Sequence, residues 1–351
     1  MARIAIIADD LTGALDTASP FACHGLHVRA ALDLDSLDEA IAARPDVLAV
    51  STNSRDLPGD RAAALAGEAA RQLFVWRPDL VLKKIDSRLK GNIAGETAAV
   101  AEVFGFSRMV AAPAVPDQGR LVRNGHVEGT GVDGQRNIAE RMPCGQFTVS
   151  ICDAASDDDL DRIAGDWRIG TDVLFVGARG LASAFARRFA GSGKPKPFIV
   201  SRPVMLAVGS RDPITAKQIA TLLAVNKGAA IVEAPGGNVP ASHASNSLTI
   251  FACKGDMTEP PALVATRFAR SVAAEAARTN PSTMLLTGGD TALAVLQALG
   301  VRTLDIRGEA AAGLPWFEVA SADGGTITVV SKSGGFGTED ILAKVLGTAG
   351  Q

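Results

Sequence analysis

Short hydrophobic runs without a breaker alternate with longer segments whose apolar residues recur at helical spacing. The first run, Ile4 to Ile7, is typical of a strand buried on both faces of a parallel sheet. Further strands are predicted at 28–33, 47–51, 80–85, 109–113, 173–177, 204–208, 229–232, 248–252 and 284–287. Helices are predicted at 59–75, 93–104, 214–225, 263–278 and 291–299. Strands that alternate with helices in this way predict an α/β fold.

Two stretches interrupt the alternation. Residues 114–150 carry several glycines with proline and polar residues, which predicts loops and short hairpins. Residues 191–197 combine glycine, serine, lysine and proline without periodicity, which is typical of a linker. A chain of 351 residues is also long for a single core. We therefore expect two domains, 1–195 and 203–351, each with a mainly parallel sheet flanked by helices.

Composition narrows the class of protein. The net charge of −3 and pI near 5.9 argue against nucleic acid or an anionic membrane as a general partner. The four cysteines have no Cys-x-x-Cys spacing, so neither a zinc site nor a disulfide framework is indicated. The chain opens on a predicted strand rather than a leader, and no apolar run approaches the roughly 18 residues of a membrane span. We expect a cytoplasmic protein.

The first predicted strand ends in Asp9 and Asp10, followed by Thr12 and Gly13. Ligands in open α/β sheets bind where a strand ends and the next helix begins. Two adjacent carboxylates are costly there unless they meet a cation, a hydroxyl-rich ligand or a proton in transit. We expect Thr12 to be the N-cap of a helix that starts at Gly13. The alternative is that Asp10 and Thr12 are simply helix caps.

A second polar cluster follows the predicted strand at 80–85. It brings cations, an acid, a hydroxyl and an amide into a few positions: Lys84, Asp86, Ser87, Arg88 and Asn92. An arginine fork suits a carboxylate, and an aspartate accepts from hydroxyls, so the mixture fits a ligand that carries both. The alternative is a solvated, salt-bridged loop. Arg120, after the next strand, is a further cation that could close over the same ligand.

The second half contains three glycine-containing turns that each precede a helix, at 208–215, 285–292 and 331–337. Paired glycines let the backbone approach a ligand closely, and the following helix N-terminus favours phosphate. Each turn alone could be an ordinary strand-to-helix connection. Three of them, each with hydroxyl side chains, favour a nucleotide-phosphate site.

Several better-known phosphate motifs are excluded. The Gly-Ser-Gly-Lys at 191–194 lacks the P-loop pattern, because Arg188 and Pro195 stand where it needs glycine and a hydroxyl residue. The Gly-x-Gly-x-x-Gly spacing of a dinucleotide fold is missing, which argues against a dehydrogenase. A haloacid-dehalogenase nucleophile would need aspartate where Leu11 stands.

Taken in order, these segments resemble the four-carbon acid sugar kinase family, the kinases of threonate, erythronate and 3-oxo-tetronate. The resemblance rests on ADDLTGA at 8–14, KIDSRLKGN at 84–92, APAVP at 112–116 with Gly119 and Arg120, GSRDP at 209–213 with Thr215 and Gln218, TGGDT at 287–291 and KSGGFG at 332–337. It runs across nearly the whole chain in the expected order. Arg88 and Lys90 depart from the family pattern, in which threonine and arginine are commoner.

The resemblance implies a transferase of carbohydrate metabolism that uses ATP and Mg²⁺, with the active site in the cleft between the two domains. The first domain would bind the sugar acid through Asp9, Lys84, Arg88, Asn92 and Arg120, with Asp10 or Asp86 acting on the attacking hydroxyl. The second would bind the nucleotide through Ser210, Thr287, Gly288, Gly289, Asp290, Gly334 and Gly335. The Mg²⁺ ligands are left unassigned.

As partners we expect the sugar acid and ATP, with a homodimer left open and neither nucleic acid nor membrane. The alternatives are a kinase of another small polyhydroxy acid or sugar, and a non-catalytic nucleotide or metabolite sensor of the same fold. Intact Asp9, Asp10 and Asp86 argue against the sensor, because a pure binding protein does not need a carboxylate that activates a hydroxyl.

Overall fold

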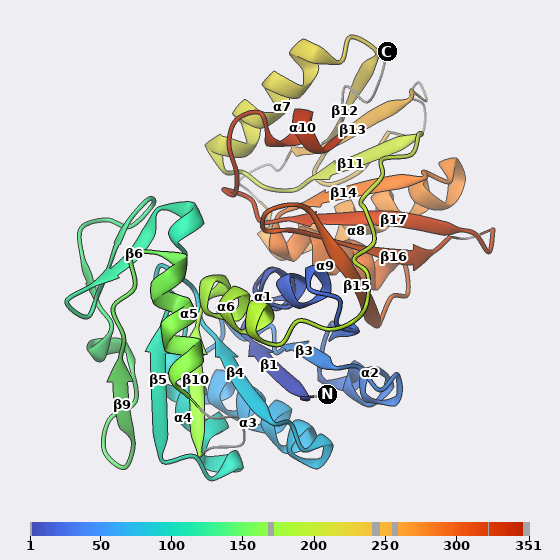
Figure 1. The fold of residues 1–351 in the computed structure, drawn as a ribbon. Coiled ribbons are helices and arrows are strands. Elements are labelled where there is room, and N and C mark those ends of the chain that lie inside the picture. The colour runs from blue at the N-terminus through green and yellow to red at the C-terminus, as the bar shows by residue number, and fades with distance from the viewer. Residues whose placement is uncertain (1, 168–171, 241–245, 255–258, 322, 347–351) are drawn as a thin grey trace. The chain divides into compact units, whose positions relative to one another are not determined.

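The structure is a computed structural model that describes residues 2–167, 172–240, 246–254, 259–321 and 323–346. The chain divides into two compact units, Met1–Lys196 (unit 1) and Pro197–Gln351 (unit 2). Each unit contains its own sheet with helices packed on it (Figure 1). No helix in the described ranges has the length and apolar character that crossing a membrane requires.

The sheet of unit 1 is parallel throughout its described strands, in the order β2-β3-β1-β4-β10-β5-β9. Its strands are β1 (Ile4–Ala8), β2 (Val28–Ala31), β3 (Val47–Ser51), β4 (Leu80–Lys84), β5 (Arg108–Ala112), β9 (Thr148–Ile151) and β10 (Val173–Gly177). Every residue of β1, β3, β4 and β10 is buried, as the unbroken apolar runs predicted.

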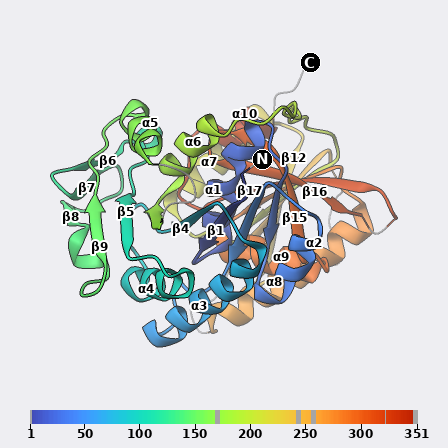
Figure 2. The same ribbon diagram turned by 60° about the horizontal axis from the view of Figure 1, so that its bottom comes forward.

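Helices cover both faces of this sheet. They are α1 (Leu11–Cys23), α2 (Leu37–Ala42), α3 (Gly59–Trp76), α4 (Ile93–Phe104), α5 (Asp157–Asp166) and α6 (Arg179–Arg188), with a short 3-10 helix at Leu34–Ser36. Helix α6 packs against α1 and α5, whereas α3 packs against α4. In Figure 2, α3 and α4 lie below the strands of unit 1, and α1 and α6 lie above them.

The segment predicted to form loops and hairpins does so. It contains 3-10 turns at Pro116–Gln118 and Ala139–Arg141, and a small antiparallel sheet of β6 (Arg120–Arg123), β7 (His126–Gly129) and β8 (Arg136–Asn137). This sheet follows β5, so it rises from the edge of the main sheet where the parallel strands end.

The sheet of unit 2 has the order β12-β13-β11-β14-β17-β16-β15 in its described part. Its strands are β11 (Val204–Val208), β12 (Ala229–Pro235), β13 (Leu248–Lys254), β14 (Thr283–Thr287), β15 (Thr303–Ala311), β16 (Leu314–Ala320) and β17 (Thr326–Lys332). The pairs up to β14–β17 are parallel, and β16 is antiparallel to both its neighbours. The helices are α7 (Pro213–Val225), α8 (Pro261–Thr279), α9 (Gly289–Ala298) and α10 (Ile341–Leu346).

The first four strands of the two units follow one plan, because β2-β3-β1-β4 matches β12-β13-β11-β14. In each unit the chain leaves the first strand toward one edge of the sheet and returns past it toward the other edge. Right-handed crossovers that run in opposite directions place their helices on opposite faces, so a crevice opens between β1 and β4, and between β11 and β14.

Several features differ from the sequence-based expectation. Strands β15, β16 and β17 and helix α6 were not predicted. Strand β15 has only alternate residues buried over most of its length, so it lacks a continuous apolar run. Helix α1 begins at Leu11 and its N-cap is Asp10, so the assignment of Thr12 as the cap was wrong. Asp10 has extended backbone, and its side chain accepts a hydrogen bond from the Gly13 amide, one of the free amides of the first helical turn. The helix therefore begins two residues earlier than expected.

Candidate functional site

The predicted site residues of unit 1 lie after the carboxyl ends of β1, β4 and β5. Strands β1 and β4 are neighbours, and their connections leave toward opposite edges of the sheet. This is the switch point at which open α/β sheets bind ligands. The topology therefore brings the acids after β1 to the polar cluster after β4.

Asp9 and Asp10 are held by one arginine that follows β3. Arg55 donates from Nε and Nη2 to the two carboxylate oxygens of Asp9, at 2.8 Å each, and from Nη1 to Asp10 Oδ2 at 2.6 Å. Asp10 Oδ1 accepts from the Gly13 amide at 2.8 Å, and Thr12 Oγ1 donates to Oδ2 at 2.9 Å. Both oxygens of each acid therefore have partners within the protein.

Arg55 and Asp9 each favour the charged form of the other. Burial would raise the pKa of Asp9, but the Arg55 hydrogen bonds and the charges of Lys83 and Lys84 outweigh it and lower that pKa. Burial would likewise lower the pKa of Arg55, but the two acids raise it. Asp9 is thus ionised and fixed, and Arg55 is the cation that the adjacent carboxylates required. Sequence reasoning missed it.

A buried polar network lies behind Asp9. Lys83 Nζ and Glu96 Oε2 form an ion pair of 2.8 Å in which both side chains are almost fully buried. Ser54 donates to Glu96 at 2.7 Å and lies 2.6 Å from the Thr52 hydroxyl, which donates to the Ala8 carbonyl at 3.0 Å. The network joins the ends of β1, β3 and β4 to α4, so it fixes the backbone that carries Asp9 and Arg55.

The turn after β4 carries groups that still have hydrogen-bonding capacity. Asp86 Oδ1 accepts from the amides of Arg88 and Lys90, at 2.9 and 3.3 Å, whereas Oδ2 has no partner among the described residues. Arg88 Nε is buried and has no hydrogen-bond partner among the described residues. Lys84 Nζ likewise has no hydrogen-bond partner among the described residues. It lies close to α1, because a Cβ added to Gly13 would come within 2.9 Å of it. Three predicted residues therefore offer free atoms to a ligand.

Two other predicted residues, Asn92 and Arg120, form hydrogen bonds mainly within the protein. Asn92 donates to the Leu57 carbonyl at 2.9 Å and so holds the turn that contains Arg55. Arg120 donates to Ser87 Oγ at 2.8 Å, to Gln118 Oε1 at 2.7 Å and to the Thr130 carbonyl at 3.0 Å. Burial and the nearby charge of Arg88 lower the pKa of Arg120. The two guanidinium groups are therefore close enough to repel.

Two further charged residues lie near this cluster and were not singled out from the sequence. Asp16, on α1, has its pKa raised by burial, although the charges of Lys84 and Arg179 act in the opposite direction. Arg179, the first residue of α6, is buried and pairs with Asp117. A partly buried acid whose pKa is raised and on which a lysine charge acts is a recurrent property of functional sites.

In unit 2 the three glycine-containing turns meet at Ser210, which follows β11. A Cβ added to Gly334 would overlap the Ser210 hydroxyl, and one added to Gly288 would lie 3.4 Å from the Ser210 amide. Gly288 has a φ of +99° and is the N-cap of α9, which begins at Gly289. Only glycine allows these backbones to approach so closely with that conformation.

The remaining predicted residues of unit 2 are at the ends of the same strands. Thr287 ends β14 and its buried hydroxyl has no partner among the described residues. Asp290 is exposed in the first turn of α9, and no ion pair to it occurs in the described chain. Gly335 packs so closely on Asp212, the N-cap of α7, that an added Cβ would overlap its carboxylate. Gly288, Gly334 and Gly335 therefore come together around Ser210 and Asp212, and Thr287 and Asp290 are close to Gly288 in the sequence.

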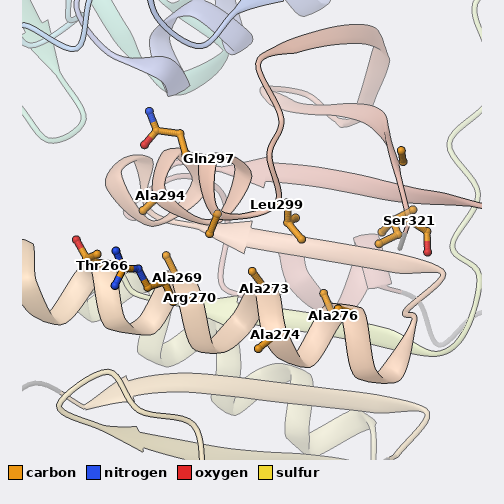
Figure 3. Close-up of a pocket in the computed structure, with 14 residues that line it drawn as sticks. Thr266, Ala269, Arg270, Ala273, Ala274, Ala276, Ala294, Gln297, Leu299 and Ser321 are labelled. Atoms are coloured by element: carbon orange, nitrogen blue, oxygen red, sulfur yellow. The ribbon is translucent and has the colours of Figure 1, made fainter. Parts of the chain in front are cut away.

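A cavity of about 830 Å³ lies elsewhere in unit 2, between α8 and α9 (Figure 3). It is lined mainly by alanines of the two helices, with Thr266, Arg270, Gln297 and Ser321 as polar residues. Ile327, near the start of β17, also lines it, whereas the glycine turn follows the other end of that strand. The cavity is therefore not formed by the turns that meet at Ser210.

No cluster of three or more histidine, cysteine, aspartate or glutamate side chains that could hold a metal ion occurs in the described ranges. A metal enclosed by protein ligands alone is not supported there. Mg²⁺ differs, because it commonly takes one or two carboxylates and completes its shell with water and substrate phosphates.

Comparison with known proteins relates both units to described families. A family model described as a sugar-binding N-terminal domain matches residues 4–136, and one described as a nucleotide-binding C-terminal domain matches residues 237–342. A D-threonate kinase of Bordetella bronchiseptica is 29% identical, over 97% of this chain and 96% of its own. A 3-oxo-tetronate kinase of Pseudomonas savastanoi pv. phaseolicola is 24% identical, over 97% of this chain and 96% of its own.

Among solved structures, the Haemophilus influenzae protein HI1011 has the same fold. It superposes with a TM-score of 0.69 at 21% identity, over 97% of this chain and 98% of the other. The two domain families and the full-length kinase relatives agree with the order of motifs in the sequence. The chain belongs to the four-carbon acid sugar kinase family.

Proposed function

We propose that the protein is an ATP-dependent kinase that phosphorylates the terminal hydroxyl of a four-carbon sugar acid. The observation that carries the proposal is the set of free atoms at the switch point of unit 1. Lys84 and Arg88 offer cationic donors, and Asp86 offers a carboxylate oxygen, within one turn. A sugar acid needs these two kinds of partner, because it carries a carboxylate and several hydroxyls.

The substrate carboxylate would bind Arg88 and Lys84. The terminal hydroxyl would donate to Asp86 Oδ2, which makes Asp86 a better candidate for the base than Asp10, whose two oxygens already have partners. In the reaction the hydroxyl oxygen bonds to the γ-phosphorus of ATP while the bond from that phosphorus to the β-γ bridging oxygen breaks. The hydroxyl proton passes to the carboxylate, and ADP leaves.

The ATP phosphates would lie on the turns that meet at Ser210. Gly288, Gly289, Gly334 and Gly335 allow close approach of the backbone, and α9 directs its N-terminus toward the same turns. Transfer requires the acid bound by unit 1 to meet the nucleotide bound by unit 2, which is the interdomain cleft expected from the sequence. Closure there would exclude the water that could hydrolyse ATP.

Mg²⁺ would neutralise charge on the β- and γ-phosphates. Asp290 is the carboxylate that fits it, because it is exposed beside Gly288 and Gly289 and unpaired in the described chain. The donor set suits an ion that arrives with the nucleotide rather than one that the protein holds alone.

The test is ATP consumption with Mg²⁺ against a panel of D- and L-threonate, D- and L-erythronate and the 3-oxo-tetronates. We expect turnover on at least one acid, and its loss by at least about a hundredfold in Asp86→Asn, the contribution typical of a general base. The matched control is Asp79→Asn. Asp79 lies at the opposite end of β4 and accepts from the Arg3 amide at 2.7 Å, so that variant should retain activity.

Arg88 tests how the substrate is recognised. Arg88→Met should raise the KM for the acid about tenfold or more, the loss expected when one charge-assisted contact is removed, and change kcat much less. No turnover on any acid of the panel would refute the proposed substrate class. Full turnover in Asp86→Asn would refute the role of that carboxylate.

A further inference from the structure

Lys332, the last residue of β17, is buried with its ammonium group beneath the glycine turn that follows it. Its exposed fraction is 0%. Nζ donates to the carbonyls of Ser333 at 2.9 Å, Gly334 at 2.6 Å and Phe336 at 3.2 Å. All three ammonium protons therefore have acceptors, and all three acceptors belong to one turn.

Two buried side chains of α7 hold the same turn. Thr215 Oγ1 donates to the Gly334 carbonyl at 2.7 Å. Gln218 Nε2 donates to the carbonyls of Phe336 at 2.9 Å, Gly337 at 3.2 Å and Thr338 at 3.1 Å. The carbonyls of the turn are thus drawn toward the interior by three side chains. No acceptor for the amides of Gly334 or Gly335 occurs in the described part of the chain.

The ammonium of Lys332 has no carboxylate within ion-pair distance among the described residues. Asp212 is the acid whose charge acts on it, and Asp212 Oδ1 already caps α7 by accepting from the Ile214 amide at 2.9 Å. Burial lowers the pKa of Lys332 to about 8, against the opposing effect of Asp212. A buried cation without a paired anion is costly, so the turn favours a negative group on its outer side.

We infer that Lys332 is the positioning residue of a phosphate-binding turn: it fixes the carbonyls of Ser333, Gly334 and Phe336 inward, so that the Gly334 and Gly335 amides face an anionic phosphate. The inference rests on the proposed function and adds to it the residue that organises one of the three phosphate turns. Successive backbone amides presented in this way form an anion-binding concavity. The lysine supplies the compensating charge through the turn, without touching the phosphate itself.

The experiment is calorimetric titration of Mg·ADP and of tripolyphosphate into the full-length protein and Lys332→Met, together with steady-state kinetics. Methionine keeps most of the stem and removes the three donors. We expect the affinity for both probes to fall about tenfold or more, with the KM for ATP raised in parallel. We expect kcat at saturating ATP and the KM for the acid to stay within about twofold.

Lys217→Met is the matched control, because Lys217 is exposed on the same unit and pairs with Glu339 at 3.2 Å. Should Lys332→Met fail to fold, Thr215→Val removes one anchor of the turn with little change in shape, and it should weaken both probes severalfold. Unchanged affinities in a folded variant would overturn the inference. Wild-type protein that binds tripolyphosphate through Lys332 but does not bind Mg·ADP would support the turn and refute the nucleotide function.

Discussion

Replacing Arg55 with methionine should destabilise unit 1 strongly. Arg55 forms two hydrogen bonds with Asp9 and one with Asp10, and it is the cation that holds the adjacent acids together. Methionine fills a similar volume but donates nothing. The variant leaves Asp9 ionised in a position where its side chain is 4% exposed. We therefore expect a large loss of folding free energy rather than the small effect of a surface ion pair.

The size of the loss follows from the burial of the two partners. Removing one partner of a buried ion pair costs about 3–5 kcal/mol. The side chains of Arg55 and Asp10 are 24% and 23% exposed, so water can replace part of the contact with Asp10. Lys83 and Lys84 continue to attract Asp9. The cost should therefore lie near the lower end, at about 3 kcal/mol.

The assay is urea unfolding followed by tryptophan fluorescence in a Trp316→Phe background, which leaves Trp76 and Trp167, both in unit 1. This choice keeps the unfolding of unit 2 out of the signal, because a chain of two units need not unfold in one step. Arg71→Met is the matched control. Arg71 pairs with Glu68, but the two side chains are 59% and 46% exposed, so we expect at most about 1 kcal/mol. Equal losses in the two variants would refute the reasoning about the buried pair.

Two further predictions concern stability. Gly165→Ala, in α5, should stabilise unit 1 by about 0.5 kcal/mol, because an added Cβ meets no atom within 4 Å; an unchanged or lower urea midpoint would contradict this. The pKa of Asp9 is lowered on folding, so its contribution to stability is complete above its ordinary value near 3.8 and is lost as the pH falls through the lower folded value. Urea unfolding measured at a series of acidic pH values should show a smaller decline in the free energy of unfolding in Arg55→Met than in the wild type. An equal decline in the two proteins would assign the acid sensitivity to other groups.

The local pattern was sufficient to predict most of the elements and the place of the site. Strands β3, β10 and β11 and helix α4 have the predicted bounds, because each is a buried run or a periodic segment between clear breakers. The turns after β1 and β4 were predicted to bear polar clusters, and the structure brings them to neighbouring strands. This part of the fold depends on residues that are close in sequence.

What the pattern could not supply is the set of partners from distant segments. Arg55 meets Asp9 only because β3 pairs with β1, and strand order is not encoded in any local run. For the same reason the sequence could not show that both oxygens of Asp10 have partners, whereas one oxygen of Asp86 has none among the described residues. The role of Lys332 depends on three-dimensional hydrogen bonds to its own turn, which a sequence motif does not reveal. The roles proposed for the predicted site residues stay predictions until they are measured.

The most direct test of the proposed kinase activity is ³¹P NMR of the protein with Mg·ATP and the acid that gives turnover. The account predicts that ADP and one new phosphomonoester form in equal amounts, with the ester phosphorus split by the two protons of a terminal CH₂ group. It also predicts no inorganic phosphate beyond the rate without protein. Release of inorganic phosphate in place of the ester, or an ester at a secondary hydroxyl, would contradict the proposed reaction.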